Sequence, residues 1–355
     1  MKNLKLIGFL MIFASSLMFI QCTSDPIAGP QGTAGIDGID GTDGINGANG
    51  IDGLDNTENC IACHSLDHRD PIQTAYEKSS HYNVTVLYNA QTLPEYGNRT
   101  SCANCHTSQG FIEFQETGIV SEPFAVPATI TCTTCHSNHR SFDFGNDGQD
   151  FALRTIDPIE LVVDSGYTID MTNDSNPLGT SNTCINCHQP RTATPTSADG
   201  MFTVTSTHWG PHHGPQATFL EGIQGAHIVG TTAYPTPQSA THRTGSSCVS
   251  CHMGVTADGT DGGHSFKPTE SSCIACHTSG VPTEVGGLEA DMVTLAGLLE
   301  DIGIVVDDSP VKGTFTILEA EAAWNYLFVT EDKSKGIHNP GYARALIQNS
   351  IEALQ

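Results

Sequence analysis

The chain has 355 residues and is strongly acidic, since Asp and Glu outnumber Lys and Arg by 39 to 14 and the formal net charge is −25 at pH 7. Nucleic acid and anionic membrane surfaces repel such a chain, so neither is expected as a partner. Cationic proteins and mineral surfaces attract it. The composition is also rich in possible metal ligands, with 13 cysteines and 16 histidines.

Residues 1–21 are typical of an export signal of the lipoprotein type. Two lysines near the start precede an uncharged, mainly apolar run over residues 6–20, which is shorter than a membrane-spanning helix requires. Cys22 follows at once, as in bacterial lipoprotein signals, where that cysteine is lipidated; Gln21 departs from the small residue usual there. We expect an exported protein held at the outer membrane or cell surface by its lipid alone. An ordinary cleaved signal, with a periplasmic or secreted protein, is the alternative.

Residues 22–56 are interpreted as a collagen-like spacer. Glycine occupies every third position from Gly29 to Gly53, as the crowded axis of a collagen triple helix requires. Pro30 is the only proline in this repeat, which favours an acidic, glycine-rich spacer that buries no core. The alternative is a genuine triple helix, and therefore a trimer. Either form would hold the following domain away from a membrane.

The domain at residues 57–280 contains six copies of C-x-x-C-H, numbered first to sixth in chain order. They are Cys60/Cys63/His64, Cys102/Cys105/His106, Cys132/Cys135/His136, Cys184/Cys187/His188, Cys248/Cys251/His252 and Cys273/Cys276/His277. This motif attaches c-type haem: two thiols form thioethers to the porphyrin, and the histidine binds the iron. The sequence therefore predicts six haem c groups.

Other uses of paired cysteines do not account for this pattern. A disulfide framework or a set of structural zinc sites gives no reason for a histidine after every second cysteine. Thioredoxin-like redox motifs do not recur six times along one chain.

The same region predicts a mainly α fold with extensive loops. Its hydrophobic periodicity is poor, and Gly, Pro, Ser, Thr and Asn clusters interrupt it, for example at 172–181 and 192–199. Six large apolar haems would supply much of the missing core. We therefore expect short helices, long loops, little sheet and a haem-packed interior.

The segment 281–355 is predicted to be a helical tail. Apolar residues recur at helical spacing over 287–302, 317–329 and 341–354, and Pro340 lies where the first turn of a helix tolerates proline. We expect a helical hairpin or three helices packed against the haem region.

Four segments of the chain, 207–217, 263–266, 322–327 and 332–340, resemble a known family. They are similar to parts of the bacterial multihaem cytochromes c, the superfamily around the pentahaem nitrite reductases, octahaem reductases and hydroxylamine oxidoreductases. The pentahaem nitrite reductases attach their catalytic haem through a motif that ends in lysine, whereas all six motifs here end in histidine. Nitrite reduction of that type is therefore not expected.

Ten histidines lie outside the motifs, and six of them would give every iron a second axial ligand. The resemblance implies His264 and His338 as distal ligands. It also implies His81, whose segment resembles the one that follows a first haem. His139 follows the motif histidine His136 by three residues, so one loop could serve two neighbouring haems.

Two further positions complete the predicted set. His213 or its neighbour His212 should supply one ligand, and we select His213. His242 is the sixth choice, with His208 close behind. His68 and His227 are left as ordinary solvated side chains. The predicted distal ligands are His81, His139, His213, His242, His264 and His338.

A haem with histidine on both faces carries electrons, whereas an open face binds substrate. The leading hypothesis is an electron carrier that serves redox proteins or soluble and solid acceptors, with no catalytic residue. The alternative is a reductase of a small nitrogen or sulfur compound at one open haem, with Arg140, Arg191 or Arg243 binding the anion. A subunit of a cytochrome filament is the third hypothesis.

Overall fold

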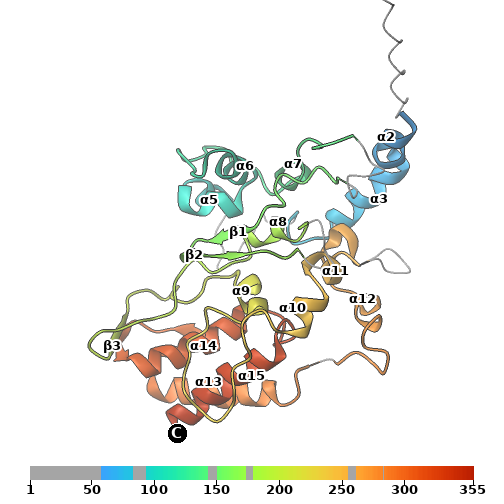
Figure 1. The fold of residues 1–355 in the computed structure, drawn as a ribbon. Helices are drawn as coiled ribbons and strands as arrows, with labels where there is room; N and C mark the ends of the chain where they lie inside the picture. The colour runs from blue at the N-terminus through green and yellow to red at the C-terminus, as the bar shows by residue number, and fades with distance from the viewer. Residues whose placement is uncertain (1–56, 83–92, 143–149, 173–178, 255–260, 283) are drawn as a thin grey trace, which may run out of the picture. The chain divides into compact units, whose positions relative to one another are not determined.

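The computed structural model describes residues 57–355 except 83–92, 143–149, 173–178, 255–260 and 283 (Figure 1). The described residues belong to one compact unit. The predicted signal, Cys22 and the glycine repeat lie outside the described residues. Within the described part, no helix is both long and apolar enough to cross a membrane.

The region of the motifs is built from short helices joined by loops, as the sequence predicts. Its helices are α2 (Thr57–His64), α3 (Leu66–Tyr76), α4 (Leu93–Gly97), α5 (Thr100–His106), α6 (Ser108–Thr117), α7 (Cys132–Cys135), α8 (Asn182–Ile185), α9 (Gln216–Glu221), α10 (Thr241–Gly245), α11 (Cys248–His252), the 3₁₀ turn η2 (Gly263–Ser265) and α12 (Glu270–Ile274). Most are one or two turns long, too short to be stable in isolation.

The described strands form three small antiparallel ladders. They pair β1 (Ile159–Leu161) with β2 (Asp164–Ile169), β3 (Met201–Val204) with β6 (Gly313–Thr316), and β4 (Val305–Val306) with β5 (Ser309–Pro310). The β3–β6 ladder matters most for the architecture because it joins the C-terminal part to the middle of the chain, with Met201 opposite Thr316 and Val204 opposite Gly313.

The tail contains the three predicted helices, α13 (Leu288–Ile302), α14 (Ile317–Asp332) and α15 (Pro340–Leu354), which pack side by side (Figure 1). Each begins or ends at recognisable signals. Thr316 and Glu319 form a capping box at the start of α14, and the Asn339 side chain accepts the Tyr342 N–H at the start of α15. α13 ends at Gly303, which adopts the left-handed conformation.

Most of the side-chain core lies in this tail. Trp324, Phe328, Leu346 and Leu299 are fully buried there and pack with Phe219 from α9. A smaller cluster lies beneath the β1–β2 ladder. In contrast, α2, α11 and α12 have no buried residue among those described. The mainly α architecture is confirmed, whereas the haem-packed interior stays a prediction.

Polar contacts fasten the tail to the loop that follows α9. The Trp324 indole N–H donates to the Gln224 carbonyl at 2.8 Å. The buried Asn325 amide bonds both backbone groups of Ala226, at 2.7 and 3.0 Å. The Tyr342 hydroxyl accepts the Gly225 N–H at 2.8 Å. Because these groups are buried, each pairing avoids a desolvation cost, and the loop is held in one position.

Candidate metal centres

Each of the six motifs begins on a short helix: α2, α5, α7, α8, α11 and α12 carry the first to the sixth in order. In α2, α5, α7 and α11 both cysteines of the motif lie in the helix. Residues three apart on a helix lie on one face, so these two thiols point to the same side. Side-chain caps fix two of these helices, from Ser247 before α11 and Thr269 before α12. The twelve motif cysteines are all free thiols, so no disulfide consumes them.

Four of the motif thiols are exposed on the polypeptide. They are Cys60 and Cys63 of the first motif, Cys132 of the third and Cys276 of the sixth. Cys63 lies on α2, whose described residues are all exposed, and Cys276 follows α12, which has no buried residue. The polypeptide alone therefore does not enclose the sulfurs of Cys63 and Cys276. A thioether requires only that the sulfur reach the porphyrin edge, so both cysteines stay predicted attachment points.

Each motif histidine faces one histidine from elsewhere in the chain. The six pairs and their ring-centre distances are His64–His139 at 6.1 Å, His106–His212 at 6.1 Å, His136–His264 at 6.1 Å, His188–His81 at 6.1 Å, His252–His338 at 6.2 Å and His277–His242 at 6.1 Å. The separations agree to within 0.1 Å although the partners come from different helices and loops.

This distance fits a metal ion between the two rings. An imidazole nitrogen lies about 2 Å from a metal that it binds, and the ring centre lies about 1 Å farther, so two rings on opposite sides of one ion are about 6 Å apart. Within the described residues, no group of three or more His, Cys, Asp or Glu side chains is arranged to hold a metal. Each pair could therefore supply two ligands and would leave the remaining positions to a planar tetradentate group such as a porphyrin, to which the two thiols of the motif would attach.

Five of the six histidines predicted as partners lie in these pairs: His81, His139, His242, His264 and His338. The sixth partner is His212 and not His213, which differs from the selected residue. His212 adopts a left-handed backbone conformation with φ of 68°. The His212 and His213 ring centres lie 5.1 Å apart, and Nδ1 of His213 lies 2.9 Å from a carboxylate oxygen of Glu331.

Hydrogen bonds at Nδ1 orient several of the paired rings and leave Nε2 available. Main-chain carbonyls accept from four of them: Phe151 from His136 at 2.8 Å, Asp150 from His139 at 2.9 Å, Ile337 from His242 at 2.6 Å and Phe266 from His252 at 2.9 Å. The Gln216 side chain accepts from His188 at 3.0 Å. His338 differs, because its acceptor is the Asp332 carboxylate, at 2.7 Å.

Burial favours the neutral form of several paired imidazoles. Burial first, and then the neighbouring imidazole, lowers the pKa of His81 and of His106 to about 4. Burial, with His213 next in size, lowers the pKa of His212 to about 4. A neutral imidazole has the free lone pair that a metal requires. Burial also disfavours charge on His338, but Asp332 outweighs it and raises the pKa of His338.

The fourth motif, on α8, contacts the second and the fifth motifs. Sγ of Cys187 lies 4.0 Å from the carbonyl oxygen of Cys105 in the second motif. The Val249 N–H of the fifth motif donates to the side chain of Ser181, which precedes α8, at 3.2 Å and so joins the fourth motif to the fifth. Figure 1 shows α8 lying between α5, α7 and α11.

The remaining motifs are also close neighbours. Burial, and then the nearby Cys251 of the fifth motif, raises the pKa of Cys273 in the sixth. His136 and His139 are three positions apart and lie in the pairs of the third and first motifs respectively. Each of the six candidate centres therefore lies close to at least one other.

Phe266 is shared by three of the pairs. Its ring centre lies 4.8 Å from that of His81 and 5.8 Å from that of His264. Its carbonyl accepts the hydrogen bond from His252 described above. Phe266 has a positive φ of 55°, which turns the carbonyl and the ring toward different centres. The segment 263–266 was singled out in the sequence for its resemblance, but only His264 in it was given a role.

The three arginines considered for anion binding are each engaged by the protein. Arg140 lies 3.6 Å from the Asp150 carboxylate. Arg191 donates to the side chain of Asn104 at 3.2 Å and to a main-chain carbonyl. Arg243 pairs with the buried Glu221 at 2.9 Å and thereby fastens α10, which carries His242.

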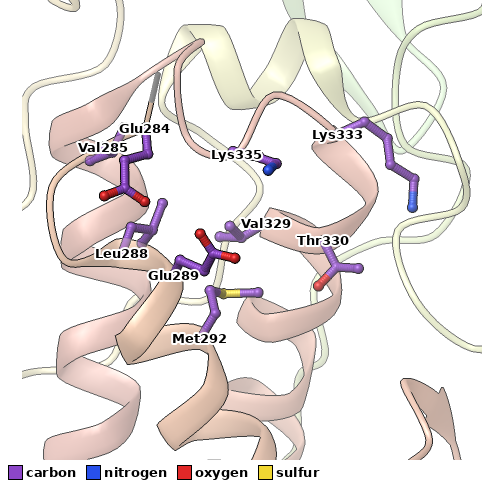
Figure 2. A pocket seen from close by; sticks show the side chains of 9 residues that line it. All are labelled: Glu284, Val285, Leu288, Glu289, Met292, Val329, Thr330, Lys333 and Lys335. Atoms are coloured by element: carbon purple, nitrogen blue, oxygen red, sulfur yellow. The ribbon is translucent and has the colours of Figure 1, made fainter. Parts of the chain in front are cut away.

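A hollow in the tail lies away from these pairs. It has a volume of about 280 Å³ and lies between α13 and α14, where Leu288, Met292 and Val329 supply apolar walls and Glu289 and Lys335 charged ones (Figure 2). None of its lining residues is a motif cysteine or a paired histidine. The imidazole pairs, and not this hollow, are therefore the candidate site.

No protein-family model matches the chain, and no curated protein sequence does. Two solved structures resemble it. The crystal structure of the outer cell wall cytochrome OcwA is 18% identical with a TM-score of 0.47, and the match covers 80% of this chain and 50% of that one. The undecahaem cytochrome from the S-layer of Carboxydothermus ferrireducens is 18% identical with a TM-score of 0.38, covering 80% of this chain and 39% of that one. The chain thus spans about half the length of the first and about two fifths of the second.

Proposed function

We propose that this protein is a six-haem c-type cytochrome that carries electrons, with histidine on both faces of every haem. The observation that carries the proposal is the set of six imidazole pairs, each combining one C-x-x-C-H histidine with one histidine from elsewhere. The motif cysteines would attach each haem, and the two histidines would bind its iron. Bound haem supplies one-electron chemistry at the iron; the chain sets its ligation, spacing and surroundings.

Exposed apolar side chains next to the motifs support bound haems. Ile61, Leu66, Phe142, Phe151 and Ile274 are between 50% and 67% exposed, although each lies within or near a motif or a paired histidine. A covalently attached porphyrin is a large apolar plate that would cover such groups. Burial of this surface would stabilise a region whose own side chains form little core.

The contacts between motifs support transfer of electrons from haem to haem. They give a path from the first motif to the third, then through Phe266 to the fourth, and on to the fifth and sixth, with the second branching from the fourth. The fourth motif is the junction of this path. Two histidines per iron leave no position for a substrate, which favours the carrier over the reductase.

The N-terminal segments would place this carrier outside the cell membrane. We propose export, lipid attachment at Cys22 and a glycine-rich spacer over residues 29–55. With a net charge of −25, the protein would meet cationic redox proteins or positively charged mineral surfaces more readily than nucleic acid or anionic lipid. In a Cys22→Ser variant the protein should move to the soluble fraction; fractionation like the wild type would contradict the anchor.

The intact mass of the mature protein tests the proposed haem count. It should exceed the polypeptide mass by six haems. A Cys273→Ser/Cys276→Ser variant should lose one haem and keep five, which separates true attachment from adventitious binding. A fully matured wild-type protein with five haems or fewer would contradict the count.

Low-temperature electron paramagnetic resonance of the oxidised protein tests the ligation. All six irons should be low-spin, and the reduced protein should bind carbon monoxide poorly. One high-spin haem that binds carbon monoxide, together with turnover of nitrite or hydroxylamine, would favour the reductase.

A further inference from the structure

One of the six pairs differs from the others in the charge of its hydrogen-bond acceptor. Asp332 is the last residue of α14, and its side chain is fully buried. Its Oδ1 lies 2.7 Å from Nδ1 of His338. Its Oδ2 accepts the hydroxyl of Ser334, whose own oxygen accepts the His338 N–H at 3.2 Å. Both carboxylate oxygens are thus engaged, and His338 is held both at its ring and at its backbone N–H.

The fold builds this arrangement at the turn between α14 and α15. Lys333 ends α14 in the left-handed conformation, and Gly336 follows with φ of 82°. A Cβ at Gly336 would lie 2.5 Å from the Leu288 side chain, so the turn packs against α13 only with glycine there. The Asp332–His338 contact therefore rests on a tightly packed turn.

Neutral groups accept at Nδ1 of the other paired histidines for which a hydrogen bond is described. The closest comparison is His139. The main-chain carbonyl of Asp150 accepts from its Nδ1 at 2.9 Å, and the Asp150 carboxylate lies 3.9 Å from the same Nδ1. That carboxylate faces Arg140 at 3.6 Å and accepts backbone N–H groups. It is therefore largely neutralised by other partners, whereas the Asp332 carboxylate is directed at the imidazole.

We propose that Asp332 is a positioning residue that lowers the reduction potential of the haem held between His252 and His338. The inference rests on the proposed function, since it requires a haem at this pair. A ferric haem carries one more positive charge than the ferrous haem that one electron produces. A buried carboxylate bonded to the ligand makes the imidazole a stronger electron donor and stabilises the extra charge, so it favours the ferric state. Little solvent screens this effect because Asp332 is inaccessible.

The test is a redox titration of the haem-loaded protein, followed optically and by electron paramagnetic resonance, in wild type and Asp332→Asn. Asn keeps an oxygen that accepts the Nδ1–H but removes the charge. We expect six low-spin haems in both proteins and an upward shift in the midpoint potential of one haem only. Asp332→Glu restores the charge and should keep that potential closer to wild type than Asp332→Asn does.

The matched control is Glu331→Gln. It removes the adjacent carboxylate, which bonds His213 and not a paired histidine. Glu331→Gln should shift the midpoint potential of the same haem by less than half as much as Asp332→Asn does. No upward shift in Asp332→Asn with six low-spin haems retained, or equal shifts in Asp332→Asn and Asp332→Glu, would overturn the proposal.

A reciprocal variant covers the case in which Asp332→Asn loses the ligand. Gln216→Glu places a carboxylate at Nδ1 of His188, where a neutral amide now accepts. It should lower the potential of a different haem, and an unchanged or raised potential would overturn the proposal. A wild-type protein without six bis-histidine haems would instead contradict the proposed function, before any potentials are compared.

Discussion

His139 lies opposite His64, with 6.1 Å between the two ring centres, although it belongs to the loop that follows the third motif. Three residues before it, His136 lies opposite His264. Main-chain carbonyls at residues 150–151 accept from Nδ1 of both histidines of this loop. One short loop thereby carries one member of each of two imidazole pairs and would hold the two haems near each other.

A His139→Ala variant should convert one haem of six from low-spin to high-spin. The reason is that only the His64 pair loses a ligand, while His136 is untouched. Electron paramagnetic resonance of the oxidised variant measures this change. His68→Ala is the matched control, because His68 is exposed and lies outside the six pairs, and it should keep six low-spin haems. If His139→Ala also keeps six low-spin haems, His139 is not an iron ligand.

His212→Ala and His213→Ala distinguish two neighbouring candidates. The His212 ring faces His106, so its loss should leave one haem high-spin and able to bind carbon monoxide. The His213 ring bonds Glu331 at the surface of α14, so its loss should leave all six haems low-spin. Carbon monoxide difference spectra of the two reduced variants measure the contrast. The reverse pattern would restore His213 as the ligand.

The angles between paired imidazole planes predict two classes of low-spin signal. Three pairs are close to perpendicular, at 76°, 77° and 89°. In the other three pairs the ring planes cross at smaller angles, 32°, 42° and 59°. Perpendicular ligand planes leave two iron d orbitals nearly equal in energy and give a highly anisotropic signal, whereas planes that cross at smaller angles give a rhombic signal. We expect about equal intensities of the two in the oxidised protein; a single class would contradict these ring orientations.

Removing Arg243 should strongly destabilise the protein. Glu221 is fully buried, and its second carboxylate oxygen has no hydrogen-bond partner among the described groups. Arg243→Leu would leave that charge without its cation, at a cost of roughly 3–5 kcal/mol in the free energy of unfolding. Glu221→Leu/Arg243→Leu removes both charges and should lose much less. Urea unfolding of the haem-loaded proteins, followed by circular dichroism, measures both; equal losses would contradict this account.

Local sequence patterns predicted the tail well. Helical spacing placed segments at 287–302, 317–329 and 341–354, and the helices span Leu288–Ile302, Ile317–Asp332 and Pro340–Leu354. Their apolar faces pack on one another, so the pattern along the chain and the fold agree. The six C-x-x-C-H motifs were likewise recognised from local residue spacing alone.

The site was less predictable where it depends on distant residues. His212 and His213 are equivalent in the sequence, and a left-handed φ together with Glu331, far along the chain, decides which ring faces His106. The roles of Phe266 and Asp332 depend in the same way on where their carbonyl and carboxylate oxygens lie. Neither hydrophobic periodicity nor a sequence motif predicts which oxygen atom contacts which histidine.

With iron bound, the six histidine pairs would also restrict the conformations of the unfolded chain. Each pair joins distant positions, from His242 and His277 at the shortest separation to His136 and His264 at the longest. Iron bound by both members would close a loop, and the loops interleave: the one ending at His139 overlaps the one that starts at His136. Closing loops lowers the entropy of the unfolded ensemble, as disulfides do. Ligation would then cross-link this loop-rich region, and removing the iron should unfold it well before the tail helices.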